Sequence, residues 1–433
     1  MRVMNSLEVL LVIRLIQFEM KKVFTSNLFR ILLLAFCVFI IAYYIFVHIN
    51  TVKVEELISE KESDIHRNQI ATQRIKDSID SSDSNSKKGF ESELEFQEEW
   101  NEKDEITLKA FQENDWTTLL NQDMARDEDH LARIRKDEYY TSSWATPFTT
   151  ETRLAEYKWL IEREIAPVLR FNYWSHMTAY DLHFPIEGGS EDEFKAMVVK
   201  LSTKYSPTGI YYLNHLFRLL FGVSGAIFFL FLFGDIVTKE GLGRNGPIHL
   251  LQTQPIRRDK VLLSKFLTVL LSSALILVVA SIFSLILGTV FDSFGYWNYP
   301  VLIYGEEYSF SFMNMSTFIL KSAFLFFMIL LFCYSILFLY SILTKRASTA
   351  LGLTIATIIM GIKLSEESVL SSLAPYIPFH YFSVPQVVTM ELAVLLKNFD
   401  FSYMNGLISL GVSSFIILVV TYFVSVMQYK YGR

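Results

Sequence analysis

The residues of this chain that could do chemistry gather in a short polar stretch between two long apolar runs, at residues 235–265. Within it, Gly241–Gly246 (GLGRNG) matches the G-x-G-x-x-G pattern of loops that bind the pyrophosphate of a dinucleotide. That chemistry needs a strand before the glycines and a helix after them. Here an apolar run precedes the glycines and Pro247 follows them. We therefore interpret the glycines as the end of a helix and a free loop.

Other patterns that would indicate catalysis or metal binding do not occur in the sequence. The G-x-x-x-x-G-K-[ST] signature is missing, so the chain is not expected to bind ATP by a P-loop. The eight histidines are scattered and form neither H-E-x-x-H nor a Cys/His cluster. Cys37 and Cys333 lie in apolar runs and are interpreted as buried small side chains. A membrane-bound enzyme is thus the least supported class of function.

What the polar stretch offers instead is positive charge around a short apolar segment. Its cations are Lys239, Arg244, Arg257, Arg258, Lys260 and Lys265, against Asp235, Glu240 and Asp259. A basic loop between two spans is expected on the cytoplasmic side. The apolar residues lie between Pro247, which suits the first position of a helix, and Pro255, which prevents its continuation. A short amphipathic helix that docks to a soluble partner is the prediction.

Composition indicates a helical membrane domain joined to a sizeable polar domain. The 433 residues are 52% hydrophobic, and the mean hydropathy is +0.31. Residues 50–208 carry a net charge of −13 and the remainder a net charge of +7. An acidic polar domain and a basic membrane portion are expected on opposite sides of the membrane.

The predicted fold class is an all-α membrane protein with six transmembrane helices, an N-terminal interfacial helix and a largely helical extracellular domain. Lys and Arg concentrate in the loops expected inside, so both termini are predicted to be cytoplasmic. The spans are expected at 28–49, 209–236, 263–291, 321–343, 348–364 and 404–428. The cytoplasmic segments are 1–27, 237–262, 344–347 and 429–433, and the external segments are 50–208, 292–320 and 365–403.

Local patterns refine two of the external segments. Apolar residues at near-heptad spacing predict a long helical hairpin over 51–80 and 89–115, and a further helix over 151–165. Residues 373–396 are apolar but are interrupted by Pro375, Pro378 and Pro385, so a continuous span is not expected there. A re-entrant or interfacial element is our interpretation, with an ordinary apolar loop as the alternative.

Two charges border the second predicted span, Arg218 at its outer end and Asp235 at its inner end. Ionisable groups at membrane depth are candidates for function by default. The alternative, for charged residues at the ends of a span, is that the side chain extends so that its charged group lies in water.

The segment 234–265 resembles the loop between the second and third spans of type-2 ABC exporter permeases. Glu240 and Gly241 match the acidic residue and glycine that precede the coupling helix of that family. Residues 249–252 match the helix, residues 255–258 the turn after it, and Lys265 the lysine that leads into the third span. The interfacial helix and the six spans agree as topology, and the large domain after the first span is similar to that of a subset of these permeases.

The resemblance implies a membrane subunit of the bacterial plasma membrane with no cofactor of its own. ATP and Mg²⁺ would belong to a separate cytoplasmic ABC ATPase. The other expected partners are a second permease copy or a sister permease, and membrane lipid, with no nucleic acid. The residues expected to couple to the ATPase are Glu240, Gly241, Arg244, Pro247, Leu250, Leu251, Pro255, Arg257, Arg258 and Lys265. For the arginines, anchoring of anionic lipid is the alternative.

Two functions remain open at this point. The first is export of an amphipathic or hydrophobic substrate such as a peptide, lipid or antibiotic, which the strongly apolar spans favour. The alternative is a non-transporting coupler that transmits ATPase motion to the extracellular domain for sensing, peptide removal or envelope work.

Overall fold

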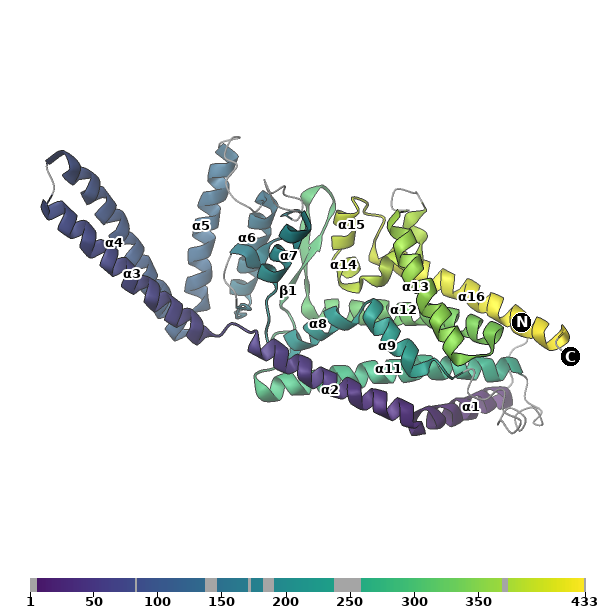
Figure 1. Ribbon diagram of the computed structural model, residues 1–433. Helices are drawn as coiled ribbons and strands as arrows, with labels where there is room; N and C mark the ends of the chain where they lie inside the picture. Colours follow the sequence, from purple (N-terminus) through teal and green to yellow (C-terminus); the bar gives the residue numbers. More distant parts are fainter. Residues whose placement is uncertain are drawn as a thin grey trace. The chain divides into compact units, whose positions relative to one another are not determined.

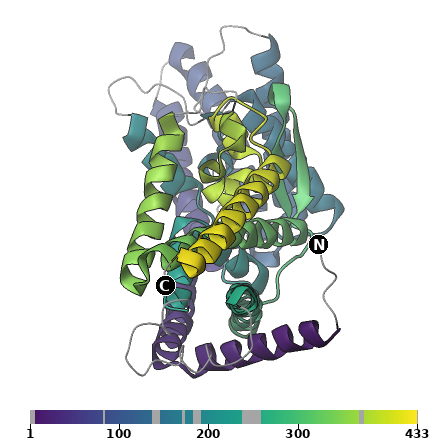
Figure 2. The ribbon, with the colours of Figure 1, turned by 90° about the vertical axis from the view of Figure 1, so that its right-hand side faces the viewer.

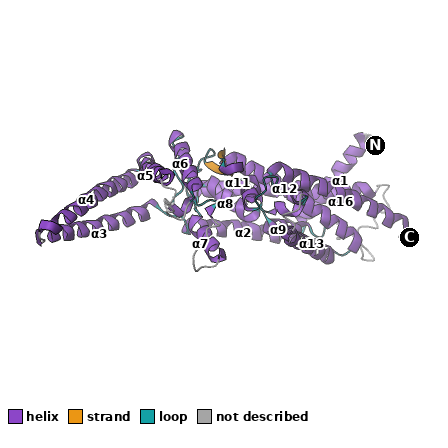
Figure 3. Cartoon of the chain, turned by 90° about the horizontal axis from the view of Figure 1, so that it is seen from above, coloured by secondary structure: helices purple, strands orange, loops and turns teal. Residues whose placement is uncertain are grey.

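The computed structural model describes residues 6–81, 84–136, 146–169, 173–181, 191–236, 258–367 and 373–431. The chain divides into two compact units. We call residues 1–46 with 207–433 the membrane unit, and residues 47–206 the helical unit. Helices dominate the described part of the chain, and one pair of short strands is drawn in orange in Figure 3.

The membrane unit consists largely of long apolar helices (Figure 1). Among the described residues, five helices are long and apolar enough to cross a membrane, and a bent pair makes a sixth span if it is counted as one. The longer helices of the unit are α1 (Ser6–Thr25), α2 (Asn27–Ile49), α8 (Gly209–Leu220), α9 (Val223–Phe233), α11 (Arg258–Phe291), α12 (Met315–Thr344), α13 (Ala347–Glu367) and α16 (Tyr403–Tyr431).

The predicted continuous span over 209–236 is broken into α8 and α9, which are bent by 78°. Polar groups freed at the break find local partners, as they must in an apolar environment. The Ser224 hydroxyl donates to the Leu219 carbonyl at 3.0 Å, and the Gly222 N–H donates to the Leu220 carbonyl at 2.9 Å. Phe221 is buried at the bend and stacks on Phe326 of α12, with 4.5 Å between ring centres.

Helix α12 lies at the centre of the unit, where it packs against α16, α13 and α9. Its side chains are apolar on every face, which is typical of a helix surrounded by others. The Tyr334 hydroxyl finds a partner in Ser273 of α11 at 2.7 Å. Lys345, in a left-handed conformation (φ 54°), ends α12 and begins the tight turn into α13.

A close crossing joins α8 to the far end of α11. A Cβ atom at Gly288 would lie 2.6 Å from the Cα of Gly209, so the two backbones touch there. The Gly209 N–H also donates to the Ser293 carbonyl at 2.8 Å. Small residues at such crossings let membrane helices approach closely.

At the same end of the unit, residues expected to form a loop contain a β-hairpin. Strand β1 (Pro300–Tyr304) pairs antiparallel with β2 (Phe310–Asn314). The Tyr304 N–H donates to the Thr389 carbonyl at 2.9 Å and so joins the hairpin to a proline-rich series of short helices. These are η4 (Ala374–Tyr376), η5 (Pro378–Phe382), α14 (Val384–Val388) and α15 (Glu391–Leu395). We call this end of the membrane unit the hairpin end. The end at which α9 ends and α11 begins is called the loop end.

The short helices follow the prolines that interrupt the apolar stretch. A proline occupies the first turn of η4, η5 and α14, where its missing N–H costs no hydrogen bond. The Tyr381 hydroxyl donates to the Pro375 carbonyl at 2.6 Å, and Ser409 of α16 donates to the Tyr376 carbonyl at 2.6 Å. The segment is therefore an ordered cap between α13 and α16.

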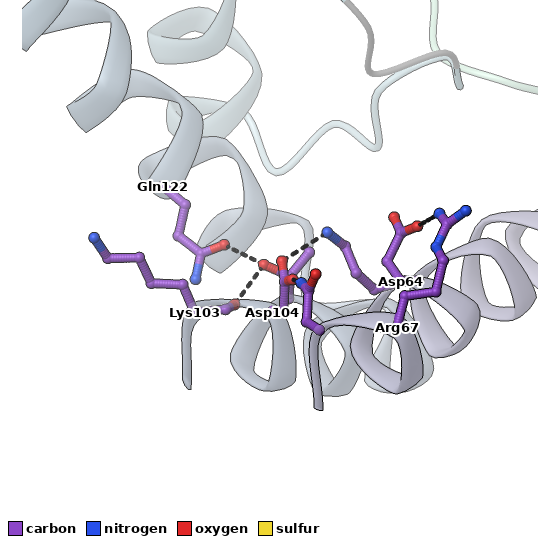
Figure 4. A network of polar contacts seen from close by, with 8 residues as sticks. Asp64, Arg67, Lys103, Asp104 and Gln122 are labelled. Carbon is purple, nitrogen blue, oxygen red and sulfur yellow. Dashed lines mark hydrogen bonds and ion pairs between the residues drawn. The ribbon is translucent and has the colours of Figure 1, made fainter. Parts of the chain in front are cut away.

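The helical unit begins with a hairpin of α3 (Val54–Ser81) and α4 (Ser84–Glu113), close to the predicted one. Asp104 accepts from Lys61 at 2.8 Å and from Asn68 at 3.0 Å, and so fixes the pairing of the two helices (Figure 4). Thr107 donates to Gln122 of α5 (Trp116–Lys136) at 3.0 Å. Helix α5 was not expected from the sequence.

The rest of the helical unit contains α6 (Pro147–Glu162), which packs on α5, and η1 (Tyr173–His176), which packs on α7 (Glu191–Ser202). Asp127 of α5 and Arg153 of α6 form an ion pair in which the side chains are only 3% and 5% exposed. Asp181 accepts from the N–H groups of Thr146 and Thr178, each at 2.7 Å. Polar groups thus replace cross-links in this unit, since both cysteines lie in the membrane unit and are free.

Candidate functional site

The predicted coupling residues fall mostly in the part of the chain that the structure does not describe. Outside the described residues lie Glu240, Gly241, Arg244, Pro247, Leu250, Leu251, Pro255 and Arg257. Arg258 is the first residue of α11, so the third span's helix begins within the predicted loop 237–262. The described remainder of the predicted set is Lys265, with Asp235 and Arg218 at the second span.

Lys265 joins the two stems of the loop. Its side chain is 4% exposed, and its Nζ donates to the carbonyl of Ile236, just past the end of α9, at 2.9 Å. The two stems of the loop, which are the residues that flank 237–257 at the end of α9 and the start of α11, are thereby bonded to each other. A buried ammonium group needs such partners, because an unpaired buried charge is strongly destabilising.

The second partner of Lys265 is a carboxylate of the interfacial helix. Glu19 of α1 is 3% exposed, and its Oε1 lies 3.9 Å from Lys265 Nζ. Lys22, one turn later, lies 4.0 Å from Glu19 Oε2. Figure 2 shows α1 lying across the membrane unit, with α11 seen nearly end-on. Three elements, α1, the end of α9 and the start of α11, therefore meet at one charged cluster.

Sequence reasoning missed Glu19. The available signal was an acidic residue one turn before Lys22, in a largely apolar helix whose other acidic residue, Glu8, lies near its start. Its partner lies in a distant span, so nothing local identified the pair.

A small hollow of about 20 Å³ lies beside this cluster, room for about one water molecule. It is lined by Glu19, Lys22, Val23, Ser26, Leu28, Phe29, Leu232, Phe233, Asp235 and Ile236. Phe29 of α2 packs near Phe233 of α9, with ring centres 6.0 Å apart. Asp235 thus lines the hollow at the loop end, whereas Arg218 does not.

Arg218 lies in the last turn of α8, on the other side of the break, and its side chain is exposed. Its guanidinium carbon is 5.7 Å from the ring centre of Phe318 in α12. Tyr304 and Glu391 lie within electrostatic reach of it. The structure therefore places Arg218 with residues of the hairpin end.

Glu391, at the start of α15, is the second functional candidate that sequence reasoning missed. It lies between α13 and α16, outside the spans, and Gln386 hydrogen-bonds its carboxylate. Burial raises the pKa of Glu391, while Arg218 and Gln386 act in the opposite direction. A lone acid inside an apolar, proline-rich stretch was the signal.

Taken together, the helices and the two charged clusters define a multi-pass membrane protein whose loop stems are bonded to an interfacial helix. A family model described as ABC-2 family transporter protein matches residues 13–428, and the chain belongs to this family. Membership makes it a permease component of an ABC system and implies association with a cytoplasmic ABC ATPase. No curated protein and no solved structure matches the chain.

Proposed function

We propose that this permease is the membrane-spanning subunit of an ATP-driven exporter, and that its substrate is amphipathic or hydrophobic. ATP and Mg²⁺ are held by the separate ATPase subunit, and this chain carries the mechanical part of the cycle. Both termini and residues 237–257 lie on the cytoplasmic side, and the helical unit lies outside.

The bond from Lys265 to Ile236 is the observation that carries this proposal. ATP binding closes the ATPase subunits, and the loop between α9 and α11 receives the displacement. Because Lys265 bonds one stem to the other and faces Glu19 at 3.9 Å, the stems and α1 move together. A displacement of the loop is then transmitted to the spans that contain α9 and α11, and is not absorbed by movement of the loop alone.

The contact with the ATPase is made by the segment between Pro247 and Pro255. Leu250 and Leu251 fill an apolar pocket on the ATPase, and Arg244, Arg257 and Arg258 lie at its rim. The remaining coupling residues, Glu240 and Gly241, shape the entry to this segment.

The transport unit contains two membrane subunits, which are two copies of this chain or this chain and a sister permease. On α2, apolar side chains such as Ile31 (65% exposed) and Leu34 (67% exposed) face outward. Lipid or the second subunit contacts this face of the helix. Apolar spans of this kind suit a substrate that is itself partly apolar.

Coexpression with the cytoplasmic ABC ATPase of the same system, followed by purification and reconstitution, tests the proposal. The ATPase is expected to copurify with the wild-type permease and with Lys265→Met. Leu250→Asp with Leu251→Asp is expected to abolish copurification. Lys265→Met is expected to retain the complex but to lose at least tenfold of substrate-stimulated ATP hydrolysis, whereas the control Lys260→Met, at the start of the same helix, retains it.

Copurification that survives the double leucine change would contradict the docking role of this segment. Full substrate stimulation in Lys265→Met would contradict the role of the bonded stems.

Mechanical coupling to the helical unit is a second candidate, favoured by the buried Asp127–Arg153 pair, which lets that unit move as a body. It predicts ATP hydrolysis that depends on the helical unit without any transported substrate. Export predicts substrate accumulation in inverted vesicles, so the vesicle assay separates the two functions.

A further inference from the structure

The exposed arginine at the hairpin end has surroundings that a purely structural ion pair does not explain. Arg218 is exposed although it lies on a helix that forms half of an apolar span. Within the described part of the chain it makes no direct ion pair, and Glu391 acts on it only at longer range. A charge in such a place needs water, a counter-charge or a ligand.

The depth of Arg218 in the membrane follows from its neighbours. Phe318, which lies under the guanidinium, is in the first turn of α12. The Ser316 N–H, also in that turn, donates to the Trp297 carbonyl at 3.0 Å. Trp297 is 41% exposed and the nearby Tyr296 is 40% exposed. Exposed Trp and Tyr side chains gather at the membrane–water interface, so the guanidinium lies at headgroup depth.

The chemistry of the surroundings favours an anionic ligand. The face of Phe318 orients the guanidinium by a cation–π contact, and none of the described side chains forms an ion pair with it at hydrogen-bond distance. Guanidinium binds phosphate and carboxylate oxygens with two parallel hydrogen bonds. Glu391 is held by Gln386 and supplies a nearby negative charge when no ligand is present.

We propose that Arg218 binds the phosphate or carboxylate head of an amphipathic molecule at the hairpin end, with Glu391 as the internal anion that the ligand's charge replaces. This inference deepens the proposed export function and rests on it for one point, that the bound molecule is substrate. The apolar tail lies along the membrane surface of the spans, and the site is where an exported amphiphile is held before release.

Binding is measured on the full-length permease without its ATPase, in micelles of the uncharged detergent dodecyl maltoside. The probe is a fluorescent lysophosphatidylglycerol, and a fluorescent monoacylglycerol, which carries neither phosphate nor carboxylate, is the neutral comparison. Glycerol 3-phosphate is added as a competitor, to distinguish recognition of a lipid headgroup from recognition of a free phosphate. The variants are Arg218→Gln, Glu391→Gln and, as a matched control, Lys321→Gln.

Lys321 is a suitable control because it also lies over an aromatic ring near the start of α12, at 5.5 Å from the ring centre of Tyr403. Arg218→Gln is expected to weaken binding of the anionic probe at least tenfold, and Lys321→Gln to change it less than twofold. Glu391→Gln is expected to tighten binding, because it removes the competing internal anion. The neutral probe is expected to show none of these changes.

Opposite effects of Arg218→Gln and Glu391→Gln distinguish a ligand site from a structural pair, whose loss would weaken binding in both variants alike. Equal weakening by both variants, or no preference for the anionic probe, would overturn the proposal. Competition by millimolar glycerol 3-phosphate would assign the site to free phosphate and overturn its role in holding an amphiphile. Because the ATPase is absent, failure here leaves the coupling proposal standing, and failed ATPase copurification leaves this binding result standing.

Discussion

At the residue scale, the membrane unit depends on a few buried charges. Lys265 and Glu19 are almost completely buried, and each supplies a counter-charge for the other. Such a pair adds little net stability compared with apolar residues. It does select one arrangement of α1, α9 and α11, because other arrangements leave a charge in an apolar environment.

A double-mutant cycle tests this coupling. Lys265→Met and Glu19→Gln are each expected to destabilise the permease by up to about 3–5 kcal/mol, because each removes one member of a buried ion pair. The double variant is expected to lose less than the sum of the two. The midpoint of denaturant unfolding in detergent micelles measures the effect. Lys21→Met, at an exposed lysine of the same helix, is the control and is expected to change stability little, and additive losses would contradict the coupling.

In the helical unit, Asp123 gives a dependence on pH. Burial and the nearby Asp127 raise the pKa of Asp123, and Arg126 and Arg153 only partly offset this. The folded state therefore holds a proton that the unfolded state has already released. Stability is expected to be greatest below the ordinary pKa of aspartate and to fall as the pH rises through the raised value.

Tryptophan fluorescence during urea unfolding of the full-length protein checks this expectation. With Trp297→Phe the signal reports the helical unit alone, since the other tryptophans all lie within residues 47–206. Asp123→Asn is expected to flatten the pH dependence over this range. A slope that is unchanged in Asp123→Asn would assign the dependence to another group.

At the element scale, the break between α8 and α9 requires glycine. A Cβ at Gly225 would lie 1.9 Å from the Leu220 carbonyl oxygen. Gly225→Ala is thus expected to lower the unfolding free energy by about 1–3 kcal/mol or more, as overpacking does. Gly352→Ala in α13 is the matched control, because a Cβ there meets nothing within 4 Å. The control is expected to be neutral or stabilising, and thermal unfolding in detergent compares the two variants.

The elements could be predicted from sequence as far as they depend on local patterns. Spans such as α2 and α12 are long apolar runs, and the α3–α4 hairpin has near-heptad spacing. The bend at residues 221–222 depends on the stack of Phe221 on Phe326, which no local pattern reveals. The same holds for the clusters: Lys265 stood out by its position in the loop, whereas Glu19 and Glu391 acquire their roles only through partners on other elements.

At the scale of the whole molecule, the orientation of the two units is a prediction of the charge distribution. In a Cys37→Ser, Cys333→Ala background, Trp100→Cys places a thiol on the helical unit, where the native side chain is 47% exposed. A second variant carries a cysteine appended after Arg433. A membrane-impermeant maleimide applied to intact cells is expected to label only the first, and labelling of only the appended cysteine would reverse the orientation.

The contact of Gly209 with Gly288 has a mechanical consequence. A crossing at which neither glycine places a side chain between the two backbones can serve as a pivot, because the helices can rotate there without displacing a packed side chain from between them. From Arg258 to Gly288, helix α11 acts as a rigid arm about 45 Å long. A rotation of roughly 10° about the pivot would move the Arg258 end of that arm, together with the elements that Lys265 bonds to it, through about 8 Å. A large displacement at the Arg258 end of α11 therefore requires almost no displacement at the Gly288 end.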